Sequence, residues 1–250
     1  MNSAANTLTI DAFTTISSSS ATQSGGVAYL TGSGTQTVNL NGGRITTASA
    51  TTGGVFYMNG LATNAVNMIS GAYISDVTTT SHGALLYMNG ITHTLTLNTM
   101  TAERVYSTNG EGGLLYSSFN TQSLTGTITN AQLLGVNAKT LGSMISLRKG
   151  PTTPTLSLTI GGSSIFRCNV NNLVTNQATV ESDITSGVST STNTRRGVAF
   201  FFEGVVADTA VSYSVTSSSS TYENCYTGGD GAVFYLPTGL RMRDTGSIFR

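Results

Sequence analysis

The chain has 250 residues, of which 9 % are charged, and its formal net charge is zero. Ordinary globular proteins carry about 25 % charged residues, and nucleic-acid binding needs a basic surface, so the composition argues against a nucleic-acid partner. No apolar run approaches the roughly 18 residues that a membrane-spanning helix needs, so no membrane span is expected in this segment.

A glycine-led apolar segment recurs along the chain. Its fullest form is Gly-Gly-Val-Phe-Tyr-Met-Asn-Gly at residues 53–60, and it returns as Gly-Ala-Leu-Leu-Tyr-Met-Asn-Gly at residues 83–90. Each copy is predicted to be a short strand entered through a turn that needs glycine. The copies share one mostly aromatic position, occupied by Tyr29, Tyr57, Tyr87, Tyr116, Ser146, Phe201 and Tyr235. The predicted turn glycines are Gly25, Gly26, Gly53, Gly54, Gly83, Gly112, Gly113, Gly142, Gly197 and Gly231.

A second element alternates small polar residues with aliphatic ones, and a period of two is typical of a half-buried strand. Its copies lie at residues 7–10, 37–40, 65–68, 94–97, 155–158 and 210–213, with a weaker copy at 123–125. A third apolar piece follows in several copies, for example at residues 43–45 and 72–74. Each repeat therefore contains two or three short strands.

The spacing between successive aromatic positions is 28 to 30 residues through the first five copies. Repetition at such a period predicts a solenoid, and no window has the 3.6-residue spacing of a helix. The signature of a leucine-rich repeat is absent, and a propeller blade needs about 40 residues. The sequence predicts an all-β parallel β-helix, right-handed by default, with about 28–30 residues per coil and roughly eight to nine coils in a rod of about 40 Å. One buried ladder is expected to contain Leu8, Val38, Val66, Leu95 and Leu156.

A single domain is expected over residues 1–250. The interval between Ser146 and Phe201 is close to two periods, so residues 170–196 are predicted to form a degenerate coil. The longer last interval predicts a loop insertion at residues 214–222. Both chain ends match internal repeat positions and show no polar cap, so the sequence is expected to be a window of a longer repeat protein.

The glycine segments, together with Phe166-Arg167-Cys168-Asn169, resemble the Gly-Gly-Ala-Ile and Phe-x-x-Asn signatures of polymorphic outer-membrane-protein repeats. Tyr222-Glu223-Asn224-Cys225, followed by residues 228–233, has the same order. The resemblance implies a β-helical, surface-exposed adhesin passenger. It implies no catalytic residues.

Several β-helix families process polysaccharides with carboxylates clustered on one face, as acid/base pairs or calcium ligands. The acidic residues here are scattered, and Glu181 and Asp183 are the best candidate pair, with a solvated turn as the alternative. His82 and His93 have no obvious Cys or acid partner at ligand spacing. No hydrolase, zinc or phosphate-loop motif occurs. We therefore expect no enzyme activity, no metal site and no cofactor.

The two cysteines, Cys168 and Cys225, lie at the same phase of their repeats. If residues 170–196 form a coil, the cysteines are two rungs apart, at roughly 9.6 Å, which is too far for a disulfide. If those residues form a loop, the cysteines are neighbours and could bond. The first arrangement is favoured, with two free thiols that face inward.

Basic residues are paired at three places, and exposed turns are expected there, with docking to an acidic partner or a polysaccharide as the alternative. These places are Arg148-Lys149, Arg195-Arg196 and Arg241-x-Arg243.

Hydroxyl and amide side chains are predicted to line one flat outer face of the coils. This candidate binding face contains Thr7, Thr9, Thr37, Asn39, Asn67, Thr94, Thr96, Thr155 and Ser157. Regular Thr arrays on β-helices can order water and bind ice, although Ala65 and the two Asn residues interrupt this array. Threonine also suits an exposed strand face without any binding function, and both interpretations stay open.

The repetition, the low charge and the lack of an active-site cluster favour a non-enzymatic structural or adhesive element of an extracellular filament or cell surface. Such an element is expected to associate end to end or with other surface subunits, and glycans are further candidate partners. The alternatives are a carbohydrate- or ice-binding β-helix that uses the flat face, and a polysaccharide-processing enzyme. No Asn-x-Ser/Thr glycosylation acceptor occurs, which favours a secreted protein that keeps its faces bare.

Overall fold

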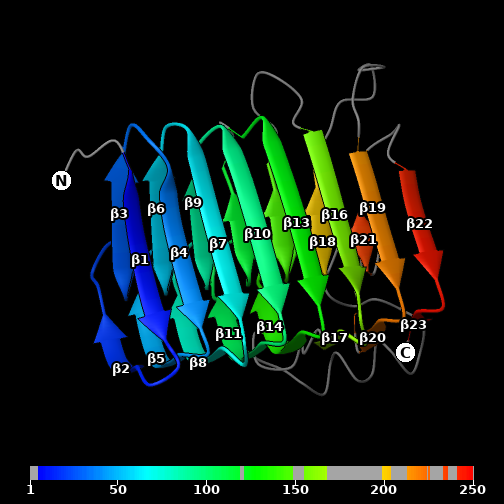
Figure 1. Cartoon of the computed structure of the whole chain (residues 1–250), viewed down its shortest axis with the longest axis horizontal. Coiled ribbons are helices and arrows are strands. Elements are labelled where there is room, and N and C mark those ends of the chain that lie inside the picture. The colour runs from blue at the N-terminus through cyan, green and yellow to red at the C-terminus, as the bar shows by residue number, and fades with distance from the viewer. Residues whose placement is uncertain are drawn as a thin grey trace.

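The computed structural model of the chain describes residues 5–118, 121–148, 155–167, 199–203, 213–223, 225, 233–235 and 241–249. These residues form strands and turns, and none of them is helical. The strands form three sheets, each built of parallel strands from successive coils, and all three sheets run along the same axis. The N-terminal and C-terminal coils lie at opposite ends of this axis (Figure 1). The predicted parallel β-helix is therefore confirmed. Its handedness stays a prediction.

The first two sheets have eight strands each in the described residues, and the third has seven. Sheet A contains β1 (Asn6–Asp11), β4 (Gln36–Asn41), β7 (Thr63–Ile69), β10 (Thr92–Asn98), β13 (Ser123–Thr129), β16 (Thr155–Gly161), β19 (Tyr213–Ser218) and β22 (Arg241–Thr245). Sheet B contains β2 (Thr15–Ser20), β5 (Arg44–Ala50), β8 (Tyr73–Thr79), β11 (Thr101–Ser107), β14 (Gln132–Ala138), β17 (Ile165–Arg167), β20 (Thr221–Glu223) and β23 (Ile248–Phe249). Sheet C contains β3 (Ala28–Gly32), β6 (Phe56–Gly60), β9 (Leu86–Asn89), β12 (Leu115–Ser117), β15 (Ile145–Leu147), β18 (Phe200–Phe202) and β21 (Phe234–Tyr235).

Each coil contributes one strand to each sheet, so strands pair with the equivalent strand of the next coil. The shared position of the glycine segments stays in register along sheet C, from Tyr29 beside Tyr57 to Phe201 beside Tyr235. Sheet C has seven strands in the described residues, so the number of coils there is slightly below the predicted eight to nine.

The residues that face the interior are set by the two-residue alternation of side chains along each strand. In sheet A the alternate residues Leu8, Val38, Val66 and Leu95 form the predicted inward ladder. The ladder then continues through Gly126, Leu158, Val215 and Met242. Leu156 was expected in this ladder and is not: it pairs with Leu124, two residues earlier along the strand.

The C-terminal part of the chain differs from the sequence predictions in two places. Residues 214–222, predicted as a loop insertion, contain most of β19 and the start of β20. The strand stripe predicted at residues 210–213 lies four residues too early, because Val215 pairs with Leu158 and continues the inward ladder. The degenerate coil predicted at residues 170–196 lies outside the described residues. The strands on either side of that segment pair directly, Ile145 with Phe200 and Phe166 with Tyr222.

Left-handed backbone conformations recur at three places in the coil. Sheet B bends at stacked positions occupied by Ser18, Thr47, Asp76, Arg104 and Gly135, all with positive φ. The corner between sheets A and B uses polar residues or glycine, for example Ser70, Thr99 and Gly162. The corner between sheets B and C uses only glycine in the described coils, at Gly25, Gly53, Gly83, Gly112 and Gly142.

The reason for this restriction is the space beside the turn. A Cβ on Gly83 would lie 2.3 Å from the carbonyl oxygen of Leu86, in its own turn. The second glycine of the predicted turn differs in its backbone conformation: Gly26, Gly54 and Gly113 do not have positive φ, and Ala84 takes the same place in another coil. Space is also short there, because a Cβ on Gly54 would lie 2.3 Å from the carbonyl oxygen of Ala84. Gly197 and Gly231 lie outside the described residues.

We predict that Gly83→Ala lowers the free energy of unfolding by about 3 kcal/mol, because it adds a backbone clash to the strain of a left-handed alanine. Gly71→Ala is the matched control. Gly71 also has positive φ, +82°, but its Cβ would meet nothing within 4 Å, so about 1 kcal/mol is expected. Urea denaturation followed by circular dichroism measures both changes, and equal losses in the two variants would contradict the role of the clash.

Candidate functional site

The outer face of sheet A is the most regular surface of the molecule, and it contains the predicted hydroxyl array. Two rows of side chains run along it from coil to coil. The first row is Thr7, Thr37, Ala65, Thr94, Thr125, Ser157 and Ser214. The second row is Thr9, Asn39, Asn67, Thr96, Thr127, Thr159 and Thr216. Neighbouring strands of a sheet are about 4.8 Å apart, and residues two apart on one strand are separated by about 6.6 Å.

Eight of the nine predicted face residues lie in these two rows. Thr155 lies on the same exposed face in a third row, with Thr63, Thr92 and Ser123. Sequence reasoning missed Thr125, Thr127, Thr159, Ser214 and Thr216. Thr125 and Thr127 were missed because Gly126 breaks the aliphatic alternation on β13, where the side chain of Leu158 approaches the space that a Cβ would fill. The other three were missed because the strand copies at residues 155–158 and 210–213 were placed too early along the chain.

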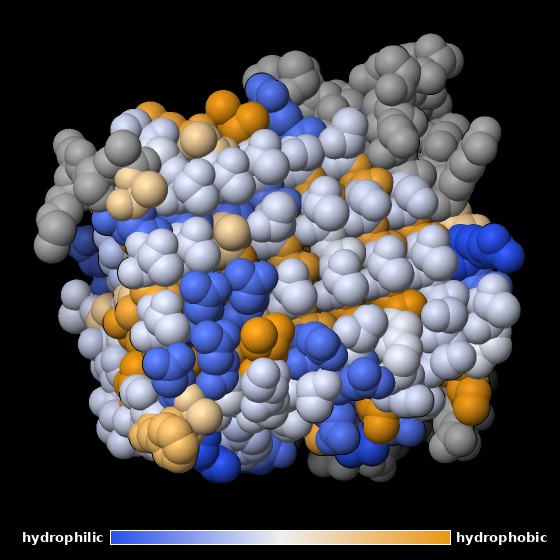
Figure 2. Space-filling model, in the orientation of Figure 1, coloured by the Kyte–Doolittle hydropathy of each residue, from blue (hydrophilic) through white to orange (hydrophobic). Residues whose placement is uncertain are grey.

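The array is uneven along the axis. On β4 and β7 it contains amides, and the Nδ2 atom of Asn67 donates to Oδ1 of Asn39 at 2.9 Å. On β10, β13, β16 and β19 both rows contain only Thr and Ser, and no charged residue interrupts them. Figure 2 shows this face as parallel rows of pale, weakly polar residues, with the strongest hydrophilic colours in a patch near the middle and at the C-terminal edge. The predicted arginines Arg241 and Arg243 lie on strand β22 and not in a turn.

The outer face of sheet C contains a column of stacked tyrosines. The ring centres of Tyr29 and Tyr57 are 4.9 Å apart, those of Tyr57 and Tyr87 are 4.7 Å apart, and those of Tyr87 and Tyr116 are 5.1 Å apart. Burial, with the neighbouring Tyr57, raises the pKa of Tyr87 to about 12. The first three rings lie face to face, with interplanar angles of 5° and 8°, and the ring of Tyr116 is tilted by 31° from that of Tyr87.

Ser146 takes the place of a tyrosine in this column, and charged residues fill the space. Its Oγ atom donates to Oε2 of Glu111 at 2.7 Å. The Nε atom of Arg148 lies 3.5 Å from Oε2 of Glu111 and 3.5 Å from Oε2 of Glu203, and its guanidinium faces the ring of Phe201 at 5.8 Å. The acidic residues are therefore less scattered than expected, and Arg148 belongs to a half-buried ion-pair cluster and not to an exposed turn.

His82 also belongs to this region, and it does have an acidic residue beside it. Its Nδ1 atom accepts a hydrogen bond from the backbone N–H of Glu111 at 3.2 Å, and its ring stacks on Tyr116 at 4.5 Å. Burial is the main cause that lowers the pKa of His82. The neutral imidazole thus packs as an aromatic ring at the edge of the tyrosine column.

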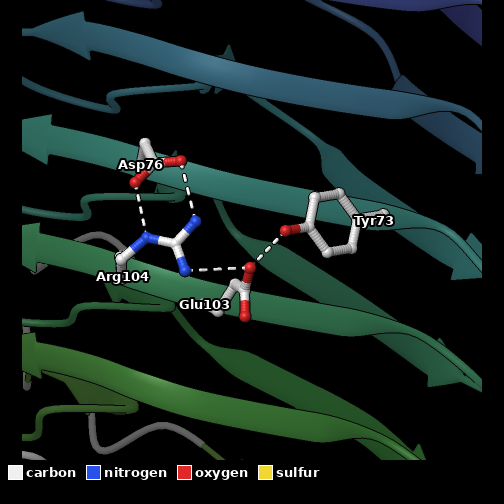
Figure 3. Close-up of polar contacts among 4 residues, drawn as sticks. All are labelled: Tyr73, Asp76, Glu103 and Arg104. Carbon is white, nitrogen blue, oxygen red and sulfur yellow. Dashed lines mark hydrogen bonds and ion pairs between the residues drawn. The ribbon is translucent and has the colours of Figure 1, made fainter.

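A second charged cluster lies on the outer face of sheet B, at the bend (Figure 3). Arg104 from β11 donates to both carboxylate oxygens of Asp76 from β8, at 2.6 and 2.9 Å, and contacts Glu103 at 2.9 Å. Tyr73 donates to Glu103 and is covered by the guanidinium of Arg44 at 4.2 Å. The hydrogen bond from Arg104 is the main cause that lowers the pKa of Asp76. The pair is exposed, and such pairs contribute little to stability.

His93 lies inside the coil, in an inward row of polar side chains that continues from Asn6 through Gln36 and Asn64. Its Nδ1 atom is 3.4 Å from Nδ2 of Asn64, and its Nε2 atom is 2.9 Å from Oγ1 of Thr121. Burial lowers the pKa of His93 to about 3. The ring is neutral and enclosed, so it serves the packing of the coils.

Among the remaining predicted residues, the structure corrects the prediction for Cys225, and six others lie outside the described residues. Cys225 is disulfide-bonded, so the favoured prediction of a free thiol is wrong. Direct pairing of Arg167 with Glu223 puts their two coils next to each other, which is the arrangement that allowed a disulfide. Glu181, Asp183, Cys168, Lys149, Arg195 and Arg196 lie outside the described residues. In the described ranges, no three His, Cys, Asp or Glu side chains are grouped to hold a metal ion.

The described part of the chain also contains no helix with the length and apolar character needed to cross a membrane. Comparison with known proteins found no matching family model, no matching curated protein and no matching solved structure.

We predict that the free energy of unfolding falls by about 1.4 kcal/mol per pH unit between about pH 6 and pH 3 because of His93. The pKa of His93 is lower in the folded chain than in the unfolded chain, so acid protonates the unfolded chain first and favours unfolding. Below pH 3 both states bind the proton and the loss ends.

The control for this prediction is His93→Gln, which keeps a polar side chain and removes the titrating ring. Carboxylates also titrate in this range, so the test is the difference between the two proteins in urea denaturation at each pH. Parallel pH profiles would contradict the prediction.

Proposed function

We propose that this protein is a non-enzymatic, adhesive β-solenoid that binds an extended, uncharged surface through the outer face of sheet A. One observation carries the proposal. The register of β10, β13, β16 and β19 aligns eight hydroxyl side chains in two straight rows, with no charged residue between them.

The chemistry of the rows suits this role. Each hydroxyl can donate and accept a hydrogen bond, and removing a hydroxyl from water costs far less than removing a charge. A single contact of this kind is weak, but contacts repeated at fixed spacing act together and raise the overall affinity. A surface with its own repeating hydroxyl groups, such as a crystalline polysaccharide, matches the array.

The cell surface or the extracellular space is the proposed location. The disulfide-bonded state of Cys225 supports it, because disulfides persist in oxidising compartments. The adhesin role implied by the resemblance to polymorphic outer-membrane-protein repeats is part of the same proposal. End-to-end association of coils into filaments stays a prediction.

Sedimentation with microcrystalline cellulose and with chitin tests the adhesive function. Wild-type protein is expected to sediment with at least one of them, and Thr127→Lys and Thr159→Lys are each expected to weaken binding at least tenfold, because the lysine breaks the flat contact. Thr78→Lys is the matched control, since Thr78 is an exposed threonine on the outer face of sheet B. Equal binding by all four proteins, or no binding by the wild type, would refute the proposal.

Ice binding is a second candidate function for the same face. It is favoured by the composition of the second row, which contains threonine on each of β10, β13, β16 and β19 and so presents a methyl and a hydroxyl group at regular intervals.

An assay of ice recrystallisation distinguishes the two functions. If ice is the ligand, wild-type protein and Thr78→Lys slow crystal growth equally, and Thr127→Lys does so only at a concentration at least tenfold higher. Normal crystal growth in the presence of wild-type protein that binds a polysaccharide would exclude the ice function.

A further inference from the structure

We propose that the corner between sheets C and A contains a separate binding site for a neutral saccharide unit. A pocket of about 320 Å³ lies there, lined by Thr31, Gly32, Ser33, Asn59 and Leu61. Its volume falls in the range of about 300–1,000 Å³ that is typical of small-molecule sites. The pocket lies between coils whose strands β3 and β6 pair in register, so its walls are held by the sheet.

Asn59 gives this pocket an oriented amide. Its Oδ1 atom accepts a hydrogen bond from Nδ2 of Asn89 on the next coil at 2.9 Å, and its backbone oxygen accepts one from Oγ1 of Thr31 at 3.4 Å. The first bond fixes which side of the amide faces the neighbouring coil. The Nδ2 group of Asn59 has no hydrogen bond to the described residues, so its two N–H donors are available to a ligand.

Apolar side chains stand next to these polar groups. Leu61 is 65 % exposed in the pocket wall, and Ile91 at the equivalent place on the next coil is 43 % exposed. A second pocket of about 440 Å³ shares Thr31 with the first and is lined also by Asn6, Tyr29 and Leu30. The two neighbouring pockets together present an aliphatic side chain at Leu61, an aromatic ring at Tyr29 and amide groups at Asn59 and Asn6.

This combination identifies the ligand class. A sugar ring has an apolar face and a rim of hydroxyl groups, so it needs a hydrophobic wall and fixed amide or hydroxyl partners together. None of the described residues that line the two pockets is charged. A ligand that carries a carboxylate or a phosphate would lose its hydration without gaining a counter-charge, so the geometry selects an uncharged saccharide.

The site does not depend on the proposed function of sheet A. It uses different residues, at a corner and not on the flat face, and its ligand is a soluble sugar unit and not an extended surface. The alternating pattern Tyr57-x-Asn59-x-Leu61 returns as Tyr87-x-Asn89-x-Ile91, so the same types of side chain recur on the next coil.

Isothermal titration of the whole chain with cellohexaose, mannohexaose and chitohexaose tests the site, with hexagalacturonate as the charged comparison. At least one neutral oligomer is expected to bind, and binding is expected to weaken at least tenfold in Asn59→Ala and in Leu61→Asp. Because the Leu61 side chain is largely exposed, the second substitution keeps the test valid even if Asn59→Ala fails to fold.

Asn109→Ala is the matched control. Oδ1 of Asn109 also accepts a hydrogen bond from the next coil, from Nζ of Lys139 at 3.1 Å. Asn109 lies in the turn between sheets B and C, so wild-type affinity is expected. The proposal is overturned if no neutral oligomer binds, if both pocket variants bind like the wild type, or if hexagalacturonate binds as tightly. Loss of binding in Thr127→Lys alone would place the saccharide on sheet A and overturn this site, while supporting the proposed function.

Discussion

Hydrogen bonds from each coil to the next are the constraint on which the molecule depends. They hold equivalent residues of successive coils at the spacing of a parallel sheet. A residue type that recurs in the sequence repeat therefore forms a row along the axis. Inside, this produces continuous aliphatic rows such as the one from Leu8 to Leu95. Outside, the same geometry turns a short sequence repeat into an ordered surface.

The three outer faces use this geometry differently. Sheet A presents hydroxyl groups, sheet C stacks tyrosines, and sheet B carries ion pairs at its bend. Where one coil departs from its row, neighbouring coils compensate: Ser146 lacks the ring of the tyrosine column, and Glu111 and Arg148 occupy that region. The chain has few charged residues, and most of the ion pairs described above join residues of different coils.

The fold was predictable because the period of about 29 residues and the glycine turns are local signals. The register was predictable wherever the inward residues are aliphatic, and it failed at β13 and β16, where Gly126 interrupts the pattern and Leu156 was placed in the wrong row. The cluster around Ser146 was not predictable, since Glu111, Arg148 and Glu203 are far apart in sequence and meet only when coils stack. Whether Cys225 is free or disulfide-bonded likewise depends on which coils are neighbours, and the sequence alone did not determine this.

The bonds between coils all run along the axis, which has a mechanical consequence. Tension along that axis loads successive rungs in series, so the rung with the fewest bonds yields first. Each rung therefore carries the whole load, so further coils would lengthen the rod without strengthening it.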